Sequence, residues 1–240
     1  PEDWPTHGVV EITNLSMRYS NKKNNPLVLK NVNFSVNSCE KIGIAGRTGC
    51  GKSSLMVALF QIEKCDPGTC IKIDGIDILT VPLSILRSRI GIIMQESLLF
   101  SETLRFNIDP FRNYSDAQIW EVLEVVSLKS AVTNMPGMLD AQIAEGGSNL
   151  SHGQRQLICF ARAILRKCKV LILDEATASI DNENDERIQA LLKERFKDST
   201  ILTIAHRLNT IIDCDRILIM SDGSVEEYDA PQALLANPSG

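Results

Sequence analysis

The feature that most constrains this chain of 240 residues is the stretch GRTGCGKS, which runs from Gly46 to Ser53. It fits the pattern G-x-x-x-x-G-K-[S/T], in which glycines let backbone N–H groups turn inward around an anion. The apolar run KIGIA precedes it, and apolar residues at helical spacing follow it. A loop between a strand and a helix start also receives the positive end of the helix dipole. The sequence therefore predicts a cradle for nucleotide phosphates.

The lysine and serine of this cradle suit ATP and Mg²⁺. Lys52 supplies a full charge to the outer phosphates, and the hydroxyl of Ser53 suits the metal ion. Cys50 lies beside Lys52 and among inward-facing N–H groups, so we expect alkylating reagents to attack it faster than the other cysteines, and bound ATP to protect it. The residues expected to contact the nucleotide are Gly46, Arg47, Thr48, Gly49, Cys50, Gly51, Lys52, Ser53 and Ser54.

Farther along, the buried run KVLIL ends in two adjacent carboxylates, Asp174 and Glu175. Because side chains alternate along a strand, these two point in different directions and suit two roles. Asp174 would hold the Mg²⁺ shell, and Glu175 would polarise a water for attack on the γ-phosphate. A solvated strand end is the alternative for this pair taken alone, and the cradle upstream favours the catalytic interpretation.

The order of hydrophobic patterns predicts a mixed α/β fold. We expect Ser115 and Ser151 to cap helices, because each directly precedes a helical pattern. The predicted segments are strands 9–20, 31–36, 41–46, 169–174, 200–205, 216–220 and 223–228, a hairpin at 70–78, and helices 52–62, 82–91, 115–128, 152–167 and 183–196. This order favours a parallel core sheet with an antiparallel piece and a helical insert.

Composition excludes several other classes of protein. Hydrophobic residues make up 44% and charged residues 23%, which is typical of a globular domain, and the net charge of −5 argues against a nucleic-acid partner. No apolar run approaches the ~20 residues that span a bilayer. The seven cysteines form no CxxC pair, so we expect free thiols in a reducing cytosol and no zinc site.

At LSHGQRQ, residues 150–156, the pattern becomes specific. The cradle, the glutamine in IMQES, LSHGQ, LILDEATASID and TIAHRL, in this order, resemble the nucleotide-binding domain of ABC transporters. WPTHG, NIDPF and AEGGSNLS look most like the second nucleotide-binding domain of the multidrug-resistance-associated, or C, subfamily. The resemblance covers residues 1–240. It implies a P-loop NTPase (RecA-like) core with an antiparallel β subdomain, an α-helical subdomain at about 96–168, and a linker at 1–8 from an upstream transmembrane region.

The resemblance also implies roles for particular residues. Tyr19 would stack on the adenine. Gln95 would reach Mg²⁺ and the attacking water, and His206 would contact the γ-phosphate. Asp181 would lie at a dimer interface. The signature segment would bind the γ-phosphate of ATP held by a second nucleotide-binding domain, and it consists of Leu150, Ser151, His152, Gly153 and Gln154.

His152 departs from the family pattern, because it replaces the glycine usual in LSGGQ. The substitution adds bulk and a titratable ring where a phosphate should approach. We expect it to be tolerated, with the ring pointing away from the helix start.

Function follows from the resemblance as an expectation. It implies the ATP-binding and hydrolysing motor of a membrane exporter, at the cytosolic face of the membrane. Its partners would be the transmembrane domains of the same full-length protein and a second nucleotide-binding domain. One alternative is a nucleotide-sensing regulatory domain of a C-subfamily channel or receptor, against which the intact Glu175 and His206 weigh. Another is a soluble ABC ATPase of translation or DNA repair, which the absent basic patch and coiled-coil insert disfavour.

Overall fold

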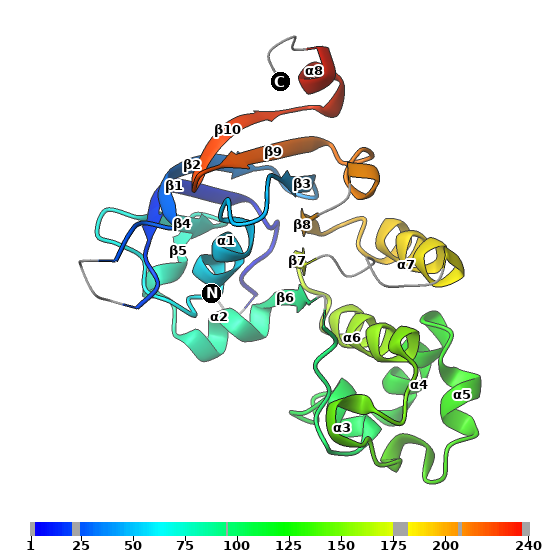
Figure 1. The fold of residues 1–240 in the computed structure, drawn as a ribbon. Coiled ribbons are helices and arrows are strands. Elements are labelled where there is room, and N and C mark those ends of the chain that lie inside the picture. The colour runs from blue at the N-terminus through cyan, green and yellow to red at the C-terminus, as the bar shows by residue number, and fades with distance from the viewer. Residues whose placement is uncertain (1–2, 21–24, 95, 175–181, 206–207, 237–240) are drawn as a thin grey trace. The chain divides into compact units, whose positions relative to one another are not determined.

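The computed structural model describes residues 3–20, 25–94, 96–174, 182–205 and 208–236, with residues 182–185 described by their backbone alone (Figure 1). The chain forms two compact units. The core unit comprises Pro1–Gly91, Lys169–Glu175 and Asp198–Gly240, and the helical unit comprises Ile92–Cys168 and Ala176–Lys197. The candidate residues are therefore divided between two bodies.

An antiparallel sheet of four strands forms one part of the core unit, in the order β2-β1-β4-β5. The hairpin predicted at 70–78 is confirmed, because β4 and β5 pair directly and its turn residues Asp74 and Gly75 have φ of 49° and 77°. Apolar side chains on one face of β1 and β2 are buried, as the alternating pattern predicts. The strands are β1 (Val10–Met17), β2 (Leu29–Val36), β4 (Cys70–Ile73) and β5 (Ile76–Asp77).

The second sheet is the one that carries the phosphate loop. Its order is β10-β9-β3-β8-β7-β6, and β9, β3, β8 and β7 are mutually parallel. Burial along β7 is almost continuous, which is typical of a strand covered on both faces. The strands are β3 (Lys41–Ala45), β6 (Ile90–Ile93), β7 (Val170–Asp174), β8 (Thr200–Ile204), β9 (Arg216–Ser221) and β10 (Ser224–Asp229). The predicted parallel sheet is confirmed.

Short helices connect these strands. The helix predicted at 52–62 is α1 (Lys52–Leu59), and that at 82–91 is α2 (Leu83–Arg89), which ends where β6 begins. The sequence did not predict β6, because its four apolar residues continue the preceding helical pattern. The remaining elements of the core unit are the 3-10 helices η1 (Ile78–Thr80) and η4 (Leu208–Thr210) and the helix α8 (Pro231–Ala236).

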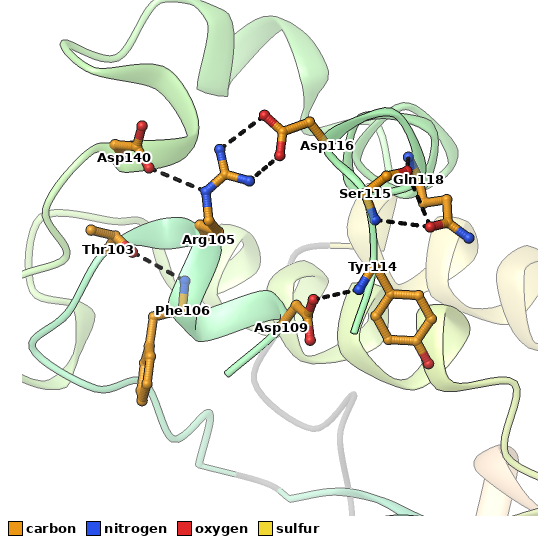
Figure 2. Close-up of polar contacts among 9 residues, drawn as sticks. All are labelled: Thr103, Arg105, Phe106, Asp109, Tyr114, Ser115, Asp116, Gln118 and Asp140. Atoms are coloured by element: carbon orange, nitrogen blue, oxygen red, sulfur yellow. Dashed lines mark hydrogen bonds and ion pairs between the residues drawn. The ribbon is translucent and has the colours of Figure 1, made fainter. Parts of the chain in front are cut away.

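The helical unit contains two predicted caps, and both are confirmed. Ser115 and Gln118 form a capping box at the start of α4, in which Ser115 Oγ accepts from Gln118 N and Gln118 Oε1 accepts from Ser115 N (Figure 2). Ser151 caps the longest helix of this unit in the same way. The elements are α3 (Leu104–Ile108), α4 (Asp116–Val125), α5 (Lys129–Thr133), η2 (Met138–Asp140), η3 (Glu145–Gly147), α6 (His152–Arg166) and α7 (Asn182–Arg195). In the described part of the chain, no helix combines the length and apolar character of a membrane span.

The N-terminal segment is held tightly against the core unit. Trp4 is buried, and its indole Nε1 donates to the carbonyl of Ile73 at 2.7 Å. The carboxylate of Asp74 accepts from the backbone N–H groups of residues 6, 7, 8 and 9. Any chain that precedes this segment is therefore joined to the sheet through a fixed attachment.

Candidate nucleotide-binding site

The phosphate loop connects the end of β3 to the start of α1, and its glycines have physical reasons to be glycine. Gly46, Gly49 and Gly51 have φ of 151°, 81° and 109°, in the range that side chains disfavour. A Cβ on Gly46 would lie 2.4 Å from the carbonyl oxygen of Met220 and 2.5 Å from Cys50 Sγ. The loop can therefore close over the edge of β9 only if residue 46 has no side chain.

Lys52 lies inside this loop. It is only 4% exposed, and its ammonium Nζ donates to the carbonyls of Gly46 at 2.6 Å and Arg47 at 3.1 Å. Among the described residues no carboxylate pairs with it. A buried charge that has only neutral acceptors gains strongly from a nearby anion. The loop therefore presents a cation and, at the start of α1, free backbone N–H groups to a phosphate.

A cavity of about 360 Å³ opens beside the loop. Its walls join Thr48, Gly49 and residues 51–54 to Tyr19, Leu27 and Val28. Tyr19 is 42% exposed, and its hydroxyl lies 2.9 Å from Ser54 Oγ. The cavity thus combines an exposed aromatic ring, which suits a base, with the phosphate loop, which suits the phosphates of a nucleotide.

The cavity also contains residues that sequence reasoning missed. Asp222 and Gly223 form the tight turn between β9 and β10 and line the same cavity. Gly223 N donates to Cys50 O at 2.9 Å, so this turn is hydrogen-bonded to the backbone of the phosphate loop. The Asp-Gly pair between two strand-like runs is a turn signal, but nothing local links it to a loop some 170 positions earlier in the sequence.

Cys50 differs from the expectation. Its side chain is 6% exposed, and Sγ lies 3.8 Å from Lys52 Nζ, underneath the loop. A buried thiol argues against the predicted fast alkylation, because the loop backbone turns this side chain toward β9. Attack by an alkylating reagent would require the loop to open first.

Asp174 ends β7 at the same edge of the sheet as the phosphate loop. It pairs in register with Ile204 of β8, and Ile204 pairs with Ile44 of β3. Neighbouring strands lie ~4.8 Å apart, so the backbones at Asp174 and Ile44 are separated by about 10 Å. Asp174 and the exposed residue Ser53 therefore both lie near the carboxyl ends of the parallel strands. The other predicted catalytic and interface residues, Gln95, Glu175, Asp181 and His206, lie outside the described residues.

The signature segment lies in the helical unit, at the start of α6. Ser151 Oγ accepts from Gln154 N at 3.1 Å, and Gln154 Oε1 accepts from Ser151 N at 3.0 Å. Leu150 is buried, Ser151 is exposed, and Gly153 is half-buried. His152 is half-buried, and within the described chain its Nδ1 is buried without a hydrogen-bond partner. The segment is thus a rigid helix start with an exposed serine, which suits an anion.

Comparison with known proteins gives the family. The family model for the ABC transporter domain matches residues 29–178. ATP-binding cassette sub-family C member 3 of Mus musculus is 52% identical over 98% of this chain. Sub-family C member 4 of Mus musculus and ABC transporter C family member 3 of Dictyostelium discoideum are each 49% identical over 99% of it. The chain spans only 15–18% of the length of these relatives.

A solved structure agrees with the fold. A bacterial Atm1-family ABC exporter with ATP bound superposes with a TM-score of 0.86, at 29% sequence identity, over 96% of this chain and 40% of that one. The phosphate loop, the parallel sheet and the signature helix start are thus parts of a known architecture. The chain belongs to the ABC transporter family and is an ATP-binding domain similar, over nearly its whole length, to members of sub-family C.

Proposed function

We propose that this domain is the ATP-driven motor of a membrane exporter, in which ATP binding brings two nucleotide-binding domains together and hydrolysis separates them. The observation that carries the proposal is the buried ammonium of Lys52, which only loop carbonyls contact. The outer phosphates of ATP supply the missing negative charge. The superposed structure supports export, since it is that of an ABC exporter with ATP bound.

Mg²⁺ fits the oxygen donors at the sheet edge. The hydroxyl of Ser53 and the carboxylate of Asp174 are hard ligands of the kind that Mg²⁺ prefers, and Gln95 would add a third. The ion would neutralise charge on the phosphates. Glu175 would orient and polarise the attacking water, and His206 would donate to the γ-phosphate.

The second phosphate site on the same chain supports head-to-tail pairing. One ATP needs one phosphate loop, yet the chain also carries an exposed helix start at Ser151. Residues 150–154 would bind the γ-phosphate of ATP held by the partner domain, with Asp181 at the interface. The resemblance to a second nucleotide-binding domain makes a first such domain in the same protein the natural partner.

An exposed apolar surface on the helical unit suits the transmembrane part of the protein. Leu98, Phe100 and Phe106 are 59%, 58% and 37% exposed, and we call them the phenylalanine patch. The rings of Phe100 and Phe106 pack edge to face, with centroids 6.0 Å apart. Clustered exposed apolar side chains mark an interaction surface more often than scattered ones do. Docking here would place the domain at the cytosolic face of a membrane.

Pairing and turnover together test the proposal. Light scattering should show that the mass of the Glu175→Gln variant of this chain rises when Mg-ATP is added and does not rise without nucleotide. ATP turnover by the full-length protein should depend on Glu175. Binding of ATP with no turnover in the full-length protein would contradict the motor and favour the nucleotide sensor. If the mass does not rise for this chain alone or for an equimolar mixture with the first nucleotide-binding domain, pairing is wrong.

A further inference from the structure

A buried amide lies beneath the phenylalanine patch, and neither ATP binding nor hydrolysis uses it. Asn107 is 0% exposed. Its Nδ2 donates to the carbonyls of Phe100 at 2.9 Å and Thr103 at 3.1 Å, and its Oδ1 accepts from Phe100 N at 2.8 Å. One side chain thus fixes the bend at residues 100–103 from both directions. This bend brings the ring of Phe100 against that of Phe106.

Arg162 joins the same bend to the signature helix. It lies on α6, about three turns after Ser151. Its Nε donates to the carbonyl of Asn107, its Nη2 to Asn107 Oδ1 at 3.2 Å, and its Nη1 to the carbonyl of Leu98 at 3.0 Å. No acidic side chain of the described residues pairs with it. All of its described hydrogen bonds therefore run to the segment that carries the patch.

The helix α3, which carries Phe106 and Asn107, is also held from its other side. Arg105 makes a two-pronged ion pair with Asp116 at the start of α4 and a 3.2 Å contact with Asp140 of η2. Figure 2 shows the ring of Phe106 directed away from these ion pairs. The helix that carries Phe106 is thus fixed to α4 through Arg105 and to α6 through Arg162.

We propose that Asn107 and Arg162 are positioning residues that make the phenylalanine patch and the signature helix one mechanical unit. A partner docked on the patch and a phosphate bound at Ser151 then bias each other's binding, because each stabilises one position of the same rigid body. This inference rests on the proposed motor function. Neither side chain lines the nucleotide cavity.

The first test is amide hydrogen exchange on the nucleotide-free chain. Arg162→Lys keeps the charge but loses the planar fork that reaches Asn107 and Leu98 together. Amides of residues 98–103 should exchange about tenfold faster in this variant, while those of α6 stay unchanged. The matched control is Arg166→Lys, one turn further along α6, where the described structure shows no hydrogen bond to lose. Equal exchange at residues 98–103 in both variants would overturn the network.

A second variant keeps the test open if Arg162→Lys does not fold. Asn107→Asp retains the oxygens that accept from Phe100 N and Arg162, but it cannot donate to the carbonyls of Phe100 and Thr103. We expect faster exchange at residues 100–103 with the link to α6 preserved. Unchanged exchange there would show that the amide does not hold the bend.

The second test separates positioning from a local structural effect, by steady-state ATP hydrolysis of the chain alone and of the full-length protein. In the chain alone, Arg162→Lys should leave kcat and KM within about twofold of wild type. In the full-length protein, kcat/KM should move toward that of the isolated chain by about 3- to 30-fold, the range for mutations along a coupling network. The same factor in both contexts would refute transmission. Absence of any turnover in wild type would refute the motor proposal instead, and the exchange comparison would still decide this inference.

Discussion

Replacing Lys52 by methionine isolates the contribution of one buried charge. Lys52→Met keeps most of the apolar stem and removes the ammonium that donates to the carbonyls of Gly46 and Arg47. Losing one partner of a buried charge pair typically removes ~2–5 kcal/mol of binding free energy. At about 1.4 kcal/mol per tenfold, the dissociation constant of ATP should rise by roughly 30- to 4,000-fold.

The stability of the nucleotide-free domain should respond differently. The ammonium is buried without a carboxylate partner in the described chain, so its removal also relieves a desolvation penalty. We expect the free energy of unfolding without nucleotide to change by less than about 1 kcal/mol. By contrast, the stabilisation of about 2.7 kcal/mol that ATP gives at 100 times its wild-type dissociation constant should fall to about 0.9 kcal/mol or less in the variant at the same ATP concentration.

Titration with a fluorescent ATP analogue and thermal unfolding with and without Mg-ATP measure both quantities. Lys64→Met is the matched control, because Lys64 is an exposed lysine of the same unit, outside the cavity. Glu175→Gln should bind ATP as tightly as wild type and fail only in turnover, since Glu175 acts on the water. If Lys52→Met binds within about threefold of wild type, the charge argument is wrong. Equal loss of binding in Lys52→Met and Glu175→Gln would refute the assignment of separate roles.

Three further predictions follow from the contacts. Burial alone would raise the pKa of Asp74, but the N–H groups of residues 6–9 lower it overall. The stability that this carboxylate contributes is therefore present above its ordinary pKa of about 4 and is lost as pH falls through the lower folded value. Asp74→Asn should lower the Tm at pH 7, and the difference from wild type should shrink steadily as pH falls below about 4. Gly223→Ala puts a Cβ 2.5 Å from the carbonyl oxygen of Val28, whereas a Cβ on Gly75, which also has a positive φ, would meet no atom within 4 Å. Gly223→Ala should therefore lose ~1–3 kcal/mol more stability than Gly75→Ala and should weaken ATP binding, and equal losses in unfolding experiments would contradict this. Brief maleimide treatment followed by mass spectrometry should label exposed Cys39 before buried Cys50, and faster labelling of Cys50 would show that the loop opens readily.

Local patterns in the sequence were enough to predict the phosphate loop, the strand before it, the helix after it and the caps at Ser115 and Ser151. Each of these depends on residues within a few positions of one another, where glycine φ angles, hydroxyl caps and hydrophobic periodicity act directly. The roles of Gln95, Glu175, Asp181 and His206 come from the resemblance to a family and stay predictions, because these residues lie outside the described part of the chain.

Only the tertiary structure decided where the side chains of these local motifs point and what they touch. Cys50 is buried because Met220 and Gly223, distant in sequence, close over the phosphate loop. Leu27 and Val28 line the nucleotide cavity because folding brings this segment, also distant in sequence, next to the phosphate loop. Nothing local to Asn107 or to Arg162 indicates that folding places one against the other. Periodicity reports which face of an element is buried, but the partner on that face is set by packing between segments that the local pattern does not relate.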